Sequence, residues 1–176
     1  MQTREQVRAH ARWLIRRDLE ECLAIEDEFF PLGWGEEEFR SNLRQRDVIA
    51  MVAEVNPHTG EVGGYMVYRL DKERLYLLNM AVRKDLRRQG VGESMVRKLA
   101  GKLSSDRRTA ITADVRESNV PAQLFLRSMG FRSKRVVRGF YEDTGEDAYV
   151  MEYCLPENSG GRHPFEGVGC VDGSDY

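Results

Sequence analysis

A change of hydrophobic period near residues 83–92 constrains the fold of this chain more than any other feature. Residues 75–82 are apolar at nearly every position, which is typical of a strand buried on both faces. After residue 90, apolar side chains recur at helical spacing, at Val91, Met95, Leu99 and Leu103. The turn between them contains Gly90 and Gly92. The sequence therefore predicts a central strand that leads directly into an amphipathic helix.

Periodicity and turn residues predict further elements on both sides of this unit. Strands are expected at residues 12–16, 48–55, 64–70, 110–115, 131–137 and 148–155. Helices are expected after a cap at Asp18, over residues 36–43, and after a cap at Ser118 or Asn119 with a stop at Gly130. The pattern predicts an α/β fold in one domain, residues 1–155, with a mixed sheet of six to seven strands and helices on both faces. Residues 156–176 hold five glycines and no periodicity, which predicts a solvated tail.

Composition excludes several classes of protein. Hydrophobic residues make up 41% of the chain and charged residues 32%, as in globular domains. The apolar runs are far shorter than the roughly 20 residues of a membrane helix, and the first residues lack the apolar core of a signal peptide. The three cysteines form no CxxC pair, so we expect no metal site and a reduced, cytoplasmic location. We expect neither a membrane nor a nucleic acid as partner.

The net charge is only −2, but the charges are unevenly distributed. The segment from Asp18 to Glu38 holds nine acidic residues and no lysine or arginine. The segment from Arg83 to Arg108 holds nine basic residues against three acidic ones. Two solvated helix faces would explain the pattern equally well. The functional alternative is a bipolar protein that attracts an anionic ligand at one end and a cationic ligand at the other.

The turn Arg87-Arg88-Gln89-Gly90-Val91-Gly92 has the chemistry of a phosphate cradle. A helix start offers unpaired backbone N–H groups and the positive end of the helix dipole. Glycines let a phosphate approach the backbone closely, and the arginines add positive charge. The sequence holds no GxxxxGK[ST] at this junction and no GxGxxG, so neither a nucleoside-triphosphate loop nor a dinucleotide fold is indicated.

Residues 75–131 resemble the core of the GNAT superfamily of N-acetyltransferases, whose acetyl-CoA signature is [Q/R]xxGx[G/A]. The resemblance continues through Val115-Arg116-Glu117-Ser118-Asn119, Pro121-Ala122 and Met129-Gly130-Phe131, and covers roughly residues 13–155. The last of these segments and Gly145-Glu146-Asp147-Ala148-Tyr149-Val150-Met151 are similar to peptide N-terminal acetyltransferases. These include the bacterial ribosomal-protein alanine acetyltransferases and their eukaryotic counterparts.

The resemblance implies acetyl-CoA as co-substrate and a protein or peptide N-terminus, possibly that of a ribosomal protein, as acceptor. It implies that the backbone of Met80 and Val82 binds the pantetheine arm, with help from Asn119. The pyrophosphate would be held by the residues from the signature onward, namely Arg87, Arg88, Gln89, Gly90, Val91, Gly92, Glu93 and Ser94.

The resemblance also indicates catalytic residues and one departure from the family pattern. Many members carry a tyrosine, often assigned as general acid, where this chain has Leu126, which cannot donate a proton. Asp114 occupies the place of a catalytic glutamate or histidine, although an ion pair with an arginine would also explain a carboxylate in an apolar strand. Tyr76 resembles a strand tyrosine of the eukaryotic branch, and core packing would explain it as well.

The acceptor is expected to lie between two aromatic segments. These are the stretch with Phe30, Leu32 and Trp34, and the pair Phe140-Tyr141, in which only Tyr141 carries a hydroxyl. Tyr141 is also a third catalytic candidate beside Asp114 and Tyr76. Two alternatives to an N-terminal acetyltransferase stay open at this point. One is an acetyltransferase for a small amine, and the other is an acyl-CoA-binding regulatory module without turnover.

Overall fold

The structure is a computed structural model, and it describes residues 8–29 and 33–155. A seven-stranded sheet has the order β1-β2-β3-β4-β5-β7-β6, in which only the β4–β5 pair is parallel. The strands are β1 (His10–Trp13), β2 (Val48–Asn56), β3 (Glu61–Leu70), β4 (Arg74–Val82), β5 (Ala110–Arg116), β6 (Arg132–Tyr141) and β7 (Glu146–Cys154). The α-helices are α1 (Leu19–Phe29), α2 (Glu36–Leu43), α3 (Val91–Ala100) and α4 (Val120–Ser128). The predicted α/β class and the mixed sheet are confirmed.

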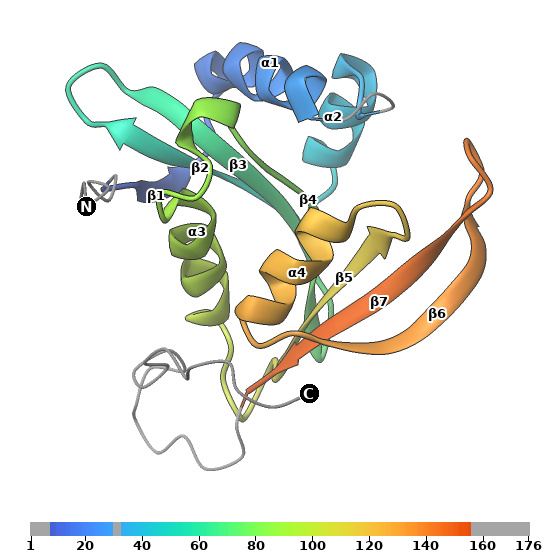
Figure 1. Ribbon diagram of the computed structural model, residues 1–176. Coiled ribbons are helices and arrows are strands. Elements are labelled where there is room, and N and C mark those ends of the chain that lie inside the picture. The colour runs from blue at the N-terminus through green and yellow to red at the C-terminus, as the bar shows by residue number, and fades with distance from the viewer. Residues whose placement is uncertain (1–7, 30–32, 156–176) are drawn as a thin grey trace, which may run out of the picture.

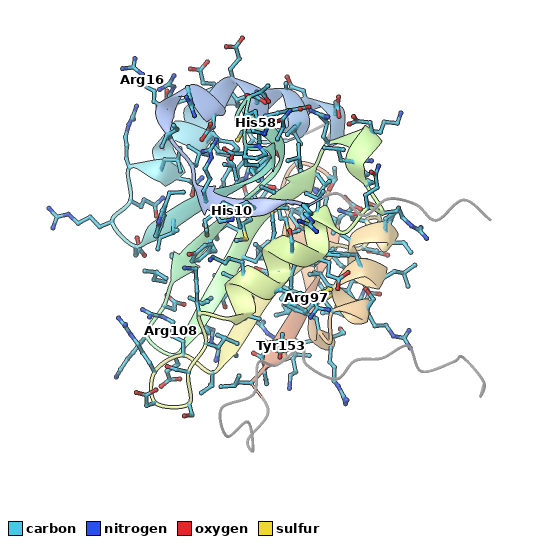
Figure 2. The ribbon with its side chains drawn as sticks, turned by 90° about the vertical axis from the view of Figure 1, so that its left-hand side faces the viewer. His10, Arg16, His58, Arg97, Arg108 and Tyr153 are labelled. Carbon is cyan, nitrogen blue, oxygen red and sulfur yellow. The ribbon has the colours of Figure 1, made fainter. Side chains whose placement is uncertain are left out.

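The helices cover both faces of the sheet, as Figure 1 shows. On one face, α1 and α2 bury Cys22, Ile25 and Phe39 against β2, β3 and the end of β4. On the other face, Val91, Met95 and Leu99 of α3 pack with Leu126 of α4 over β3, β4 and β5. In Figure 2, α3 crosses the sheet beside β1, and His10 of β1 lines a small surface hollow with Arg97 of α3. The apolar residues whose helical spacing predicted α3, Val91, Met95 and Leu99, are thus the ones that it buries against the sheet.

The central strand β4 pairs with β3 along its length but with β5 only over its first half, and this opens the sheet. Leu75 and Leu77 pair with Ile111 and Ala113 of β5, but the parallel pairing ends there. Beside this point the register of β3 with β4 shifts, so that Leu78 has no pairing partner between Leu77 and Asn79. Such a bulge bends a strand and increases its twist. The second half of β4 and the end of β5 consequently diverge.

Several predicted boundaries differ from the structure. The first strand is His10–Trp13 rather than residues 12–16, because it pairs with Met51–Glu54 of β2, and Arg16–Asp18 form a 3-10 turn (η1) instead. Asp18 is buried in an ion pair with Arg12 at 2.7 Å, directly before α1. The strand expected at 131–137 is the longer β6, which contains Phe140 and Tyr141. No helix of the described residues is long and apolar enough to cross a membrane.

Candidate active site

A cleft of about 860 Å³ lies where β4 and β5 diverge. Its walls are Leu77 to Val82 of β4 and Ala113 to Arg116 of β5. The start of α3, one side of α4, the connection between α1 and α2, and the β6–β7 turn close it on the remaining sides. The cleft is therefore built from all the segments that the sequence singled out for cofactor and acceptor, and the bulge in β4 gives it its place in the fold.

The turn before α3 forms one end of the cleft. Gly90, the N-cap of α3, has φ +87°, and Arg88 has φ +62°, which is rare for a residue with a side chain. The first helical bond runs from the N–H of Ser94 to the carbonyl of Gly90, so the N–H groups of Val91, Gly92 and Glu93 have no partner within the helix. These groups and the helix dipole have the geometry that would suit an anion, and the phosphate site stays a prediction from the sequence.

The lack of a side chain at Gly92 leaves room for a ligand to approach this helix start closely. A Cβ atom there would lie 3.2 Å from Cζ of Phe125 and 3.4 Å from Cε of Met80. Any side chain would therefore narrow the cleft at the junction of α3 and α4. Arg87, Arg88, Gly90, Gly92 and Glu93 all line the cleft, whereas Gln89, Val91 and Ser94 do not. Val91 is buried in the core, and the Ser94 hydroxyl donates to the Val91 carbonyl at 2.7 Å.

The backbone of Met80 and Val82 faces the open edge of β4. In an antiparallel ladder, successive residues alternate between bonding the neighbouring strand and pointing away from it. The N–H of Arg83 bonds the Gly63 carbonyl of β3 at 2.9 Å, so Met80 and Val82 point the other way, into the cleft. The Val82 carbonyl already accepts Nε–H of Arg87 at 3.0 Å. Of the two backbone polar groups of Val82, the N–H is therefore the one that remains suited to bind a ligand.

Asn119 is the N-cap of α4 and also lines the cleft. Its Oδ1 accepts the N–H of Ala122 at 3.2 Å, which makes it the N-cap of α4. The same residue lines the cleft, across from the end of β4. The cap occupies the carbonyl oxygen of the side chain, and its amide N–H groups can serve a ligand.

Asp114 lies on β5 in the wall of the cleft and is half-buried. Burial raises the pKa of its carboxyl, and the charges of Arg135 and Arg69 partly oppose that shift. Within the described residues both arginines act through their charge alone, without a hydrogen bond to the carboxylate. Among residues 8–29 and 33–155, no arginine is close enough to Asp114 to form an ion pair of the kind that would give it a purely structural role. A carboxylate with a raised pKa in a cleft has the properties of a general base.

Tyr141 lies next to Asp114, held there by two contacts. Its hydroxyl donates to the backbone carbonyl of Asp114 at 3.0 Å, and the guanidinium of Arg116 lies 3.9 Å from the centre of its ring. Burial raises the pKa of Tyr141 to about 12, so its hydroxyl stays protonated at neutral pH. Phe140 packs edge-on against Tyr141 with 5.0 Å between ring centres, and 44% of Phe140 is exposed. The pair presents an apolar surface with one fixed hydroxyl.

The structure does not bring Tyr76 to the cleft. Tyr76 pairs with Thr112, in the part of β4 that is still bonded to β5, whereas the cleft begins one residue later at Leu77. Its ring lies under the guanidinium of Arg69, at 5.0 Å from the ring centre. Leu126, in contrast, is buried in the wall of the cleft.

The structure describes only part of the segment with Phe30, Leu32 and Trp34 that was predicted to contact the acceptor. Trp34 lines the cleft and packs edge-on against Phe39 of α2, with 5.6 Å between ring centres. Phe30 and Leu32, which were also predicted to contact the acceptor, lie outside the described residues. The tail of residues 156–176 does as well.

Sequence reasoning missed Glu26 of α1, which lines the cleft and is buried. Its Oε1 accepts the N–H of Trp34 at 2.7 Å and Nδ2–H of Asn79 at 3.0 Å. The hydroxyl of Tyr65 is hydrogen-bonded to its other oxygen. The sequence does indicate that Glu26 lies on the buried side of the helix, because Leu19, Cys22 and Glu26 follow one another at the i, i+3, i+7 spacing of a helix face.

Charged side chains of both signs line the cleft, with Glu93 beside the arginines of the α3 turn and Arg116 at the end of β5. Arg87 and Arg88 lie at the end formed by α3, while Glu26 and Glu38 come from the acidic segment at the other end. Glu142 of the β6–β7 turn also lines the cleft, whereas Asp143 of the same turn is ion-paired with Arg116 at 2.6 Å. In the portion of the chain that is described, no cluster of three or more His, Cys, Asp or Glu side chains could hold a metal ion.

Comparison with known proteins agrees with this geometry. Residues 19–131 match the acetyltransferase (GNAT) family. The [ribosomal protein bS18]-alanine N-acetyltransferase of Escherichia coli K12 is 27% identical over 136 residues, covering 76% of this chain and 89% of the relative. An N-alpha-acetyltransferase of Sulfurisphaera tokodaii is 26% identical over 147 residues, covering 76% of this chain and 86% of the relative.

Solved structures share the fold. The crystal structure of the ribosomal-protein-S18-alanine N-acetyltransferase from Escherichia coli superposes with a TM-score of 0.73 at 24% identity, over 88% of this chain and 99% of that chain. Arabidopsis thaliana NAA60 in complex with a bisubstrate analogue gives 0.72 at 20% identity, over 85% and 99%. Together with the match over more than half of the sequence, these findings show that the chain belongs to the GNAT family of acetyltransferases and is an acyltransferase enzyme.

Proposed function

We propose that this enzyme transfers the acetyl group of acetyl-CoA to the N-terminal α-amine of a peptide or protein. The observation that carries the proposal is the half-buried carboxylate of Asp114, which lies in the divergence of β4 and β5 without an ion pair among the described residues. The relatives support it, because one is named for the alanine of ribosomal protein bS18 and another as an N-alpha-acetyltransferase.

The residues of the cleft fit acetyl-CoA. The free N–H groups at the start of α3, with Arg87 and Arg88 beside them, suit a pyrophosphate. Between them and Asp114, the backbone of Met80 and the N–H of Val82 can bind an extended amide chain in the manner of a strand. Gln89, Val91 and Ser94 would contribute through the backbone and the helix start, because their side chains do not line the cleft.

The acceptor is inferred from the energy of removing a proton from the amine, since an ammonium group cannot attack a thioester. At pH 7 a peptide α-amine costs about 1–1.4 kcal/mol to deprotonate, and a lysine side chain about 4.6 kcal/mol. An aspartate that accepts the proton through water is a modest base, sufficient for the first group and poorly suited to the second. Asp114 therefore favours an α-amine.

The other residues of the site position the acceptor. Phe140 and Tyr141 on one side and Trp34 on the other would hold the first residues of the peptide, with the Tyr141 hydroxyl fixed by its bond to Asp114. The placement of Tyr76 outside the cleft gives no support to its predicted catalytic role. When bound, acetyl-CoA supplies a thioester whose thiol has a pKa near that of free cysteine, roughly 8.5, so Leu126 need not be an acid.

The test measures coenzyme A release with three acceptor panels. The first contains peptides with free N-termini, among them peptides that start with alanine, and the second contains polyamines and aminoglycosides. The third contains the same peptides with a blocked N-terminus and an internal lysine. We expect turnover with the first panel alone. Turnover with small amines alone would replace the proposal, and acetyl-CoA binding without turnover on any panel would indicate a regulatory module.

The relatives also suggest a natural acceptor protein. A ribosomal protein N-terminus is the first candidate, because the Escherichia coli relative bears that name. The cytoplasmic location stays a prediction from the sequence.

A further inference from the structure

Glu26 is the most completely buried carboxyl group of the cleft, with 1% of the residue exposed. It lies on α1, its two oxygens are hydrogen-bonded, and the reaction proposed above does not use it. We propose that Glu26 is a positioning residue that holds Trp34, and with it the acceptor wall of the cleft, against β4. This inference rests on the proposed function, because it assigns the structural basis of acceptor binding.

The partners of Glu26 come from three different segments. Trp34 belongs to the connection between α1 and α2, Asn79 follows the bulge of β4, and Tyr65 lies on β3. The backbone N–H of Trp34 and the amide of Asn79 share one carboxylate oxygen, at 2.7 and 3.0 Å. One side chain thus joins the acceptor segment to the strand whose open edge faces the cofactor end of the cleft.

The bond to Trp34 is the contact that matters for the acceptor. Trp34 is bonded through its backbone, so Glu26 fixes the path of the chain while the indole remains free to line the cleft. The edge-on contact of the indole with Phe39 orients the ring, and Glu38 of the same helix also lines the cleft. Loss of the Glu26 bond would therefore displace the acceptor wall and leave the α3 end of the cleft intact.

The chemistry of the three partners separates positioning from proton transfer. In Glu26→Gln the amide oxygen can still accept from Trp34 and Asn79, and its NH₂ can donate to Tyr65, whose hydroxyl also accepts. In Glu26→Leu both N–H donors lose their acceptor, and an unsatisfied buried donor is costly. Positioning therefore predicts that glutamine preserves function and leucine does not. A proton acceptor would be lost equally in both variants.

The kinetic test compares these variants with Glu20→Leu, an exposed substitution on the same helix, as the matched control. We expect Glu26→Leu to raise the peptide KM about tenfold or more, with the affinity for acetyl-CoA by calorimetry unchanged. Glu26→Gln should stay within about threefold of wild type, because its hydrogen bonds can be kept. Tyr65→Phe keeps the ring and removes one donor, so it should raise the peptide KM less, and it serves if Glu26→Leu does not fold.

A second measurement needs no activity. In a Trp13→Phe background Trp34 is the sole tryptophan, since the chain has two. Acrylamide quenching of its fluorescence should increase with Glu26→Leu and stay unchanged with Glu26→Gln and Glu20→Leu. The fluorescence result does not depend on activity. If the wild-type enzyme acetylated no peptide, that finding would refute the proposed function but not the role of Glu26 in holding Trp34.

Two outcomes would overturn the inference. Unchanged Trp34 quenching and unchanged peptide KM in folded Glu26→Leu would show that the carboxyl does not position the wall. An equal loss of kcat in Glu26→Gln and Glu26→Leu, with Trp34 quenching unaltered, would instead make Glu26 a proton acceptor.

Discussion

Two carboxyl groups of the cleft, Asp114 and Glu26, have raised pKa values for the same main reason, burial. Their surroundings differ. Glu26 is surrounded by hydrogen-bond donors that fix it in place, while Asp114, within the part of the chain that the structure describes, receives only the charge of Arg135 and Arg69. A carboxylate without fixed donors can exchange protons with water, and one with three donors is held as part of the structure. The two groups therefore fit different roles in one cleft.

The role of Asp114 is tested by Asp114→Asn, which keeps the shape and removes the proton acceptor. We expect kcat/KM at neutral pH to fall about 10²–10⁴-fold, the usual contribution of general-base catalysis. The carboxylate form exists above the pKa, and burial raises that pKa, so wild-type activity should decline as pH falls through a value above that of an ordinary aspartate. The variant's deficit should shrink above pH of about 8, where the α-amine is already neutral.

Initial rates across pH for wild type, Asp114→Asn and the exposed control Asp106→Asn provide the measurement. A deficit that is constant across pH would indicate displaced groups rather than a lost base. Full activity of Asp114→Asn at neutral pH would leave deprotonation by solvent as the explanation.

At the scale of elements, the start of α3 and the start of α4 both line the cleft, and each combines a helix end with a candidate binding surface. Gly90 is the left-handed N-cap of α3, and Asn119 is the N-cap of α4. Both positions serve the fold and the proposed cofactor site at once. The effect of a substitution on stability can be separated from its effect on cofactor binding by comparing it with a control substitution that has the same local backbone geometry or the same capping ability.

Gly90→Val places a branched side chain at φ +87°, where left-handed backbone costs about 1–2 kcal/mol for a residue other than glycine. Gly60→Val is the matched control, because Gly60 has φ +73° and lies in the β2–β3 turn, away from the cleft. Both variants should lower thermal stability, and only Gly90→Val should raise the dissociation constant of acetyl-CoA. Equal affinity in the two folded variants, by calorimetry, would contradict the phosphate site.

The two roles of Asn119 are separated by Asn119→Ser and Asn119→Ala. Serine retains an N-cap acceptor, whereas alanine loses it at a cost of about 1 kcal/mol, or roughly 2–4 °C in Tm for a protein of this size. If the side-chain amide also donates to acetyl-CoA, both variants should bind it more weakly, but only Asn119→Ala should unfold earlier. Wild-type affinity in Asn119→Ser would reduce Asn119 to a cap.

At the scale of the whole molecule, the net charge of −2 conceals a cleft with a basic and an acidic end. Arg87 and Arg88 lie at the α3 end, and Glu38 and Glu142 lie at the acceptor end, contributed by elements on opposite walls. Exposed charges interact over a distance that salt shortens, from about 30 Å at 0.01 M to about 3 Å at 1 M. Acceptor selection should therefore depend on ionic strength.

Two peptides that differ only in a lysine or a glutamate near the free N-terminus test this dependence. At low salt we expect a higher kcat/KM for the lysine peptide, because the acidic end attracts it. The ratio of the two values should approach one as salt increases. A ratio that does not change with salt would show that the acidic residues contribute little to acceptor binding, and Glu38→Gln with Glu142→Gln would identify the contributing side.

Much of the fold could be predicted, because its information is local. The helical spacing of Val91, Met95 and Leu99 and the glycines before them depend on neighbours in the chain, so α3 and the glycine turn before it could be predicted from the sequence. The same holds for the cap at Asn119 and for the continuous apolar run of β4. Predicted ends of β1 and β6 were wrong because pairing with β2 and β7, not local composition, sets where an edge strand begins and stops.

The sequence by itself determined the class of fold, the strand–turn–helix unit and the chemistry of its turn, because period, glycine and charge act over a few residues. Only the tertiary structure decided where β4 and β5 part, and hence that Leu77 lies in the cleft and Tyr76 does not. It also decided that Glu26 meets Asn79, 53 residues away along the chain. Both outcomes depend on strand register and on packing across the sheet, which no short window of sequence contains.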